Sequence, residues 1–208
     1  MRLLSRSLAG LLFVAVCLPA QELQPIPLPK PQTEGGKPLM QALKERKSGR
    51  EFSPEKLPPQ VLSNLLWAAW GVNRPDGHRT APSAMNRQEI DVYVALADGL
   101  YLYNAKAHQL DPVLKEDVRA ATGGQPFVGQ APLNLVYVAD QARQGRPEDS
   151  WAFAATGFIS QNVYLYCASE GLTTVVRAMV DRAALSKAMK LRPDQKITLA
   201  QTVGYPKK

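Results

Sequence analysis

Five consecutive residues, Arg46-Lys47-Ser48-Gly49-Arg50, place three cations and one hydroxyl at the end of an expected helix and in the turn that follows it. Arginine can bind a phosphate or a carbonyl–imide edge through two hydrogen bonds, lysine supplies a point charge, and serine can bond to either group. The cluster therefore predicts a site for an anionic ligand. The alternative is a solvated basic helix end, because cations interact favourably with the negative end of the helix dipole.

A second polar cluster, residues 79–88, contains Pro82, Ser83 and Asn86. A rigid Pro-Ser turn is followed there by an amide side chain that can both donate and accept hydrogen bonds, as the edge of a heterocycle requires. The cluster lies in a stretch, residues 73–88, that has no apolar periodicity, and a loop of this length in a compact domain is often functional. The alternative is an ordinary polar turn.

Other kinds of catalytic site are poorly supplied with residues. The two histidines, His78 and His108, are not accompanied by cysteines at metal-ligand spacing, so we expect no metal site. A Gly-x-Ser-x-Gly nucleophile elbow, a phosphate-binding P-loop and a Gly-x-Gly-x-x-Gly dinucleotide fingerprint are all missing from the sequence. Cys167 stands in an apolar helical context and is expected to be a core residue. Any chemistry is therefore expected to come from a cofactor, with no catalytic side chain.

The elements that must position these clusters alternate between helical and strand patterns. Helices are expected at residues 39–47, 58–70, 112–121, 148–170 and 181–190, and strands at 90–96, 100–103, 133–139, 173–176 and 197–203. Asp98-Gly99 marks a hairpin between the first two strands. The helix at 148–170 is apolar on most sides and is expected to be buried. This order predicts an α+β fold, with a central mixed and mainly antiparallel sheet flanked by helices.

The ends of the chain differ from this domain, which we assign to residues 39–208. Arg2 and Arg6 precede an apolar run over residues 8–18, and this pattern predicts a signal peptide at 1–20, cleaved near Ala20. The run is too short for a stable membrane anchor. A lipoprotein anchored at Cys17 is a weaker interpretation, because Val16 stands where a small residue is usual. Residues 21–38 are rich in proline and are expected to form an extended arm.

The chain carries a net charge of +7, which falls to +5 once Arg2 and Arg6 leave with the signal. This balance suits an anionic ligand or a solvated surface. No dense basic run with interleaved aromatic residues indicates a nucleic-acid partner. The signal predicts an exported protein, periplasmic or secreted.

Several stretches, taken in order, resemble the FMN-dependent nitroreductase-like family over about residues 39 to 206. They are Ser48-Gly49-Arg50-x-Phe52, Pro82-Ser83-Ala84-x-Asn86-x-Gln88, Asp98-Gly99-Leu100-Tyr101, Gln125-x-Phe127, Ala131-Pro132, Gln161-Asn162-x-Tyr164-Leu165, Gly171-Leu172 and Gly204-Tyr205-Pro206. The resemblance implies an intertwined homodimer with two FMN molecules at its interface, each contacted by both subunits.

The resemblance also implies a role for each matching residue. Arg46, Lys47 and Ser48 would hold the FMN phosphate and ribityl chain, and Arg50 the pyrimidine edge. Pro82, Ser83 and Asn86 would come from the loop of the other subunit. The backbone of Val176, Arg177 and Ala178 would lie beside flavin N5 and O4, and the Arg177 side chain would be able to reach phosphate or substrate.

The reaction implied is ping-pong: a donor reduces FMN and leaves, and a quinone, nitro compound or similar acceptor then takes both electrons. Export puts the usual donor NAD(P)H in question, because it is a cytoplasmic reductant. Two alternatives stay open, namely a dehydrogenase or oxidase of azoline-like substrates and an exported flavin-binding protein with little turnover. The chain also lacks the basic C-terminal extension of many family members, and it has Met179 where glycine is common.

Overall fold

The structure is a computed structural model that describes residues 23–145 and 149–207. The signal peptide expected at residues 1–20 and the first two residues of the arm lie outside the described residues. The described part of residues 21–38 contains the short strand β1 (Ile26–Pro27) and no helix, and it packs on its own chain. The Leu28 N–H donates to the His108 carbonyl at 3.1 Å, and the Gln32 N–H donates to Asn64 Oδ1 at 2.9 Å.

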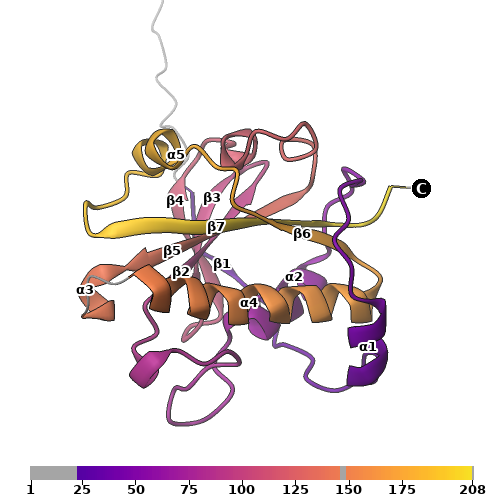
Figure 1. The fold of residues 1–208 in the computed structure, drawn as a ribbon. Helices are drawn as coiled ribbons and strands as arrows, with labels where there is room; N and C mark the ends of the chain where they lie inside the picture. Colours follow the sequence, from indigo (N-terminus) through magenta and orange to yellow (C-terminus); the bar gives the residue numbers. More distant parts are fainter. Residues whose placement is uncertain (1–22, 146–148, 208) are drawn as a thin grey trace, which may run out of the picture.

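One sheet of seven strands forms the centre of the described part of the chain (Figure 1). The strands are β1 (Ile26–Pro27), β2 (Ile90–Leu96), β3 (Gly99–Asn104), β4 (Gln109–Leu114), β5 (Leu133–Asp140), β6 (Thr173–Arg177) and β7 (Gln195–Gly204). Their order across the sheet is β1-β4-β3-β2-β5-β7-β6, and every pairing is antiparallel. The α+β fold predicted from the sequence is confirmed, with a sheet that is antiparallel throughout the described residues.

Helices cover both faces of this sheet. They are α1 (Leu39–Glu45), α2 (Pro59–Trp70), α3 (Gln141–Gln144), α4 (Asp149–Glu170) and α5 (Arg182–Ala188), with 3-10 turns η1 (Ala84–Asn86) and η2 (Arg119–Thr122). The α2 and α4 helices share a core cluster with one face, while α5 packs against the other (Figure 1). No helix in the described ranges is both long and apolar enough to cross a membrane.

The prediction of a helix at residues 112–121 is wrong. Residues 109–114 instead form β4, which pairs with β3 as an antiparallel neighbour. Pro112 lies opposite Tyr101, beyond the short stretch of β4 that β1 covers, so its missing N–H removes no hydrogen bond to β1. The helical part of this region is only the 3-10 turn η2. The other expected helices and strands are confirmed to within a few residues.

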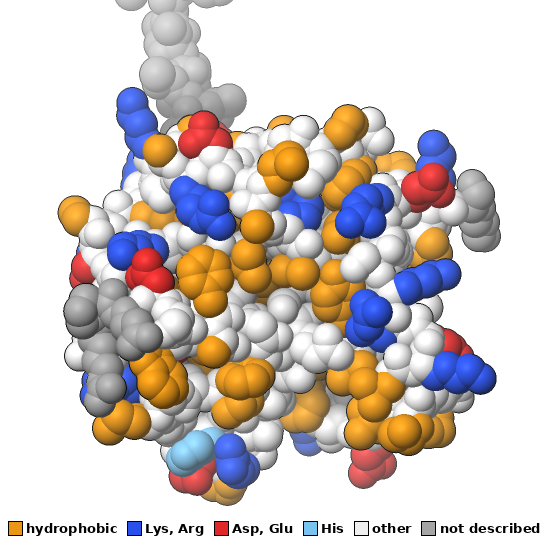
Figure 2. Space-filling model, viewed as in Figure 1, with side chains coloured by type: hydrophobic (Ala, Val, Ile, Leu, Met, Phe, Trp, Pro, Cys, Tyr) orange, Lys and Arg blue, Asp and Glu red, His pale blue; other side chains and the backbone are white. Residues whose placement is uncertain are grey.

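The long helix α4 is buried on one side only, whereas its apolar sequence predicted a buried helix. Ala152, Ala155, Ile159, Val163 and Cys167 face the sheet and are buried. On the other side, large hydrophobic side chains stay exposed by 43% to 49%: Trp151, Phe153 and Phe158. A single copy of the chain therefore leaves an apolar helix face uncovered, and Figure 2 shows hydrophobic side chains across this side of the molecule.

Candidate functional site

The basic segment 46–50 leaves α1 and runs against strand β6. The Gly49 N–H donates to the Thr174 carbonyl at 3.0 Å. A Cβ at Gly49 would collide with the Thr173 hydroxyl, so a larger residue here would force that side chain to move. This contact fixes the basic segment beside the strand that leads into Val176.

Tyr164 on α4 joins the two segments. Its hydroxyl lies 2.8 Å from Ser48 Oγ and accepts a hydrogen bond from the Val176 N–H at 3.0 Å. The Arg46 guanidinium lies over the Tyr164 ring, 5.3 Å from its centroid. The structure therefore brings together two of the three segments that the sequence indicates. The role of Tyr164 was not predicted, because the sequence does not show which side of α4 faces β6.

Three cations, Arg46, Lys47 and Arg50, set the charge of this segment. Among the described residues, neither Arg46, Lys47 nor Arg50 forms an ion pair. Glu45, which comes directly before the segment, is paired with Lys37 at 2.6 Å, and this hydrogen bond lowers the pKa of Glu45. The segment thus keeps three positive charges available for an anion.

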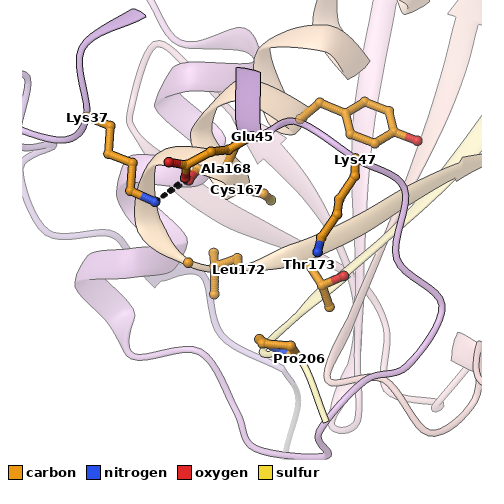
Figure 3. A pocket seen from close by; sticks show the side chains of 10 residues that line it. Lys37, Glu45, Lys47, Cys167, Ala168, Leu172, Thr173 and Pro206 are labelled. Carbon is orange, nitrogen blue, oxygen red and sulfur yellow. Dashed lines mark hydrogen bonds and ion pairs between the residues drawn. The ribbon is translucent and has the colours of Figure 1, made fainter. Parts of the chain in front are cut away.

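A cavity of about 400 Å³ opens beside these residues. Figure 3 shows the Lys47 ammonium beside the Thr173 side chain on one side of the cavity and the Lys37–Glu45 pair on the other. Tyr164 and Pro206 also line it. The cavity therefore has a lysine with no ion-pair partner in the described residues on one wall and a neutralised carboxylate on the other, as anion binding requires.

The loop at residues 73–88 is held in shape by Gln88. The Gln88 N–H donates to Ser83 Oγ at 2.9 Å, and Gln88 Nε2 donates to Asn86 Oδ1 at 3.0 Å. Gln88 Oε1 accepts from Arg79 Nε at 2.7 Å. Three residues here, Met85, Asn86 and Gln88, have φ near +50°, a conformation that costs energy outside glycine. Such strain is common in loops that bind ligands.

Pro82, Ser83 and Asn86 make no hydrogen bond or ion pair with the basic segment within the described chain. Ala84 and Met85 in this loop line a small cavity together with Trp151, near the start of α4. Tyr164 lies thirteen residues further along that helix, which corresponds to about 20 Å. Figure 1 shows the loop and α1 on opposite sides of the view, near opposite ends of α4. One chain alone does not bring the third segment to the other two.

Arg177 ends β6 with its side chain directed into the protein. The residue is 4% exposed, and its guanidinium donates to the Thr122 carbonyl, Asn134 Oδ1 and Thr202 Oγ1 at 2.8 to 3.1 Å. Burial lowers the pKa of Arg177 to about 10. This side chain does not reach the surface, so the expectation that it contacts phosphate or substrate is wrong. Only the expected role of the Arg177 backbone stays a prediction. The next two residues, Ala178 and Met179, are exposed.

Two further expectations concern reactive groups. Cys167 is buried within the core, as expected, and burial raises the pKa of its thiol. No three His, Cys, Asp or Glu side chains gather as a metal site in the part of the chain that the structure describes.

Comparisons with known proteins agree with this geometry. Residues 43–205 match the model of the Nitroreductase family. A protein named as a nitroreductase in Methanocaldococcus jannaschii is 33% identical over 151 residues, which span 66% of this chain and 76% of that protein.

Solved structures give the same result. A structure named as a nitroreductase from Ralstonia eutropha JMP134 is similar at a TM-score of 0.85 and 47% identity, over 88% of this chain and 90% of that one. A structure from Desulfovibrio desulfuricans, named as a nitroreductase in complex with FMN, aligns at a TM-score of 0.62 and 24% identity, over 84% of this chain and 89% of that one. The second likeness shows a shared fold.

Proposed function

The chain belongs to the nitroreductase family, and from that premise we propose that it is an FMN-dependent oxidoreductase. It would pass two electrons at a time from a small-molecule donor to a quinone, nitro compound or similar acceptor, in a ping-pong reaction. FMN, when bound, supplies the redox chemistry, and the residues of the chain bind and orient it.

The observation that carries this proposal is the meeting of the basic segment and β6 at the Tyr164 hydroxyl. Arg46, Lys47 and Ser48 would hold the phosphate and ribityl chain, and Arg50 the pyrimidine edge. The donor set suits the group, because cations with no acidic partner in the described chain can bind a phosphate without breaking an existing pair. Positive donors near the ring would also favour its reduced, more negative form.

We propose that the site is completed by a second copy of the chain. The exposed aromatic face of α4 needs a cover, and two copies related by a twofold axis would use the same face twice. If the two α4 helices run antiparallel, the start of one helix meets the end of the other. Pro82, Ser83 and Asn86 of one copy would then reach the basic segment of its partner, and their rigid loop would hold Asn86 in place without a large ordering cost.

The flavin proposal is tested by the absorption spectrum of the purified protein and by titration with FMN. We expect bound flavin, or quenching of FMN fluorescence with saturation at one FMN per chain. A protein with no flavin absorbance that also leaves added FMN unquenched would contradict the proposal.

Anaerobic mixing with NADH, NADPH and dithionite then tests the donor. Bleaching by a nicotinamide would support the reductase. Bleaching by dithionite alone would favour the two alternatives, a dehydrogenase or oxidase of azoline-like substrates or a flavin-binding protein with little turnover. Export, proposed from residues 1–20, makes a donor other than NAD(P)H the one to search for.

A further inference from the structure

A second cavity, of about 100 Å³, lies between the loop that contains η1 and the start of α4. It is lined by Ala84, Met85, Arg87, Glu89, Gln144 and Trp151. None of these residues belongs to the basic segment, and Tyr164 lies about 20 Å further along α4.

Glu89 is the unusual residue of this cavity. It is 1% exposed, and neither carboxylate oxygen has a hydrogen-bond partner among the described residues. The backbone at Glu89 is fixed, because its carbonyl accepts the Asp140 N–H at 2.8 Å. A buried carboxylate without a partner is unfavourable unless it is protonated or paired with a cation.

The cations nearby are engaged elsewhere. The Arg143 guanidinium pairs with Asp91 at 2.6 Å and with Asp140 at 3.2 Å, and it reaches only the backbone carbonyl of Glu89, at 3.5 Å. Arg87 lines the cavity, but its guanidinium donates to the Arg143 carbonyl at 3.4 Å. In the described part of the chain, no cation neutralises the Glu89 carboxylate.

We propose that this cavity binds a small organic cation, an alkylammonium or guanidinium group that pairs with Glu89. The Trp151 ring and the Met85 thioether line this cavity, and they would contact the alkyl part and the cationic group of the ligand. The small volume favours one unbranched chain over a bulky ligand. The proposal stands on this cavity alone and does not depend on flavin binding.

Calorimetric titration of the purified protein with n-butylammonium chloride tests the proposal. We expect saturable binding to the natural sequence and at least about tenfold weaker binding to Glu89→Gln, which keeps the shape but removes the charge. The matched control is Glu55→Gln, the same change at an exposed glutamate, and it should bind as the natural protein does. n-Butanol, of similar length but neutral, should not bind.

Trp151→Leu provides a second variant, and it should also weaken binding while sedimentation shows the same oligomeric state as that of the natural protein. The proposal would be overturned if butylammonium did not bind, or if it bound Glu89→Gln equally well. An infrared carbonyl band of protonated Glu89 at neutral pH, together with no binding, would identify the residue as a neutral core acid.

Discussion

At the scale of single residues, the hydroxyl of Tyr164 links the basic segment to strand β6 through Ser48 and Val176. Tyr164→Phe keeps the ring under Arg46 but leaves the Val176 N–H without its acceptor. We expect the free energy of unfolding to fall by about 1 kcal/mol, because a partly buried donor loses its acceptor. Denaturant unfolding measures this change, and FMN titration should show weaker binding because Ser48 loses its support.

Tyr166 provides the matched control on the same helix. Its hydroxyl donates to the Val61 carbonyl at 3.3 Å, away from the basic segment. Tyr166→Phe should therefore leave FMN affinity unchanged. If both variants lost the same affinity, the effect would belong to α4 as a whole and not to the link between Ser48 and Val176.

The Arg177 side chain has a structural role, because it joins buried polar groups inside the protein. Its guanidinium donates to Thr122, Asn134 and Thr202 inside the protein, and a Cβ at Gly123 would collide with it. Arg177→Lys keeps the charge but loses the planar fork, so several buried acceptors lose their donors. We expect a loss of about 2 to 4 kcal/mol in the free energy of unfolding.

Arg182→Lys on α5 is the control for this prediction. Its guanidinium also donates to two carbonyls, of Ile197 and Thr198, but at a partly exposed position where water can replace the lost bonds. Its denaturation midpoint should move much less than that of Arg177→Lys. Equal shifts would show that the buried network around Arg177 is not special.

At the scale of elements, His108 connects the arm, strand β3 and helix α2. Its ring nitrogens lie 3.1 Å from the Pro29 carbonyl, 2.7 Å from Ser63 Oγ and 3.0 Å from the Tyr103 hydroxyl. Burial lowers the pKa of His108 from its ordinary value of 6.5. The unfolded chain therefore takes up this proton first, and the stability present above pH 6.5 is lost as the pH falls below that value.

We expect the free energy of unfolding to decrease between about pH 7 and about pH 5.5, with a smaller slope in His108→Asn. Asparagine tolerates the φ of +49° at this position, so the variant removes the titration without adding backbone strain. Urea denaturation at several pH values measures the slope. The control is His78→Asn, at the only other histidine of the chain, and it should keep the slope. If the slope disappeared in His78→Asn and stayed in His108→Asn, the assignment to His108 would be contradicted.

Elements whose signals are local were predictable from the sequence. Pro59 and Gly71 mark the two ends of α2, and Asp98-Gly99 marks the β2–β3 hairpin; the structure has both elements at these positions. Strand β4 was not predictable, because it forms through pairing with β3 and its Pro112 is a poor strand residue by local preference.

The candidate site also has a part that the sequence predicted and a part that it did not. The charges of the basic segment can be read from composition, but its support by Tyr164 depends on how α4 is rotated against β6. The inward direction of Arg177 likewise depends on the alternation of β6, whose start is set by its pairing with β7.

At the scale of the whole molecule, two features are not explained by a single copy of the chain: its exposed apolar surface, and the separation of the loop with Asn86 from the basic segment. The exposed face of α4 carries three large aromatic side chains, and Leu39, Met40 and Leu43 of α1 add further exposed apolar surface. The loop with Asn86 and the basic segment with Arg50 also lie near opposite ends of α4. A homodimer would explain both, because it would cover the apolar face and bring each loop to the site of the partner.

Mixed dimers test this arrangement directly. We expect Arg50→Ala and Asn86→Ala each to weaken FMN binding by about 1 to 3 kcal/mol in their own dimers, through loss of a charged or buried hydrogen bond. Lys44→Ala, an exposed cation on α1, is the control for net charge and should bind FMN normally. When the two site variants are co-expressed with different tags and the mixed dimer is isolated, one site combines both altered residues and the other combines both natural ones. Titration should then recover half of the natural number of tight FMN sites. If each site were built from a single chain, both sites of the mixed dimer would carry one altered residue, and no tight binding would return.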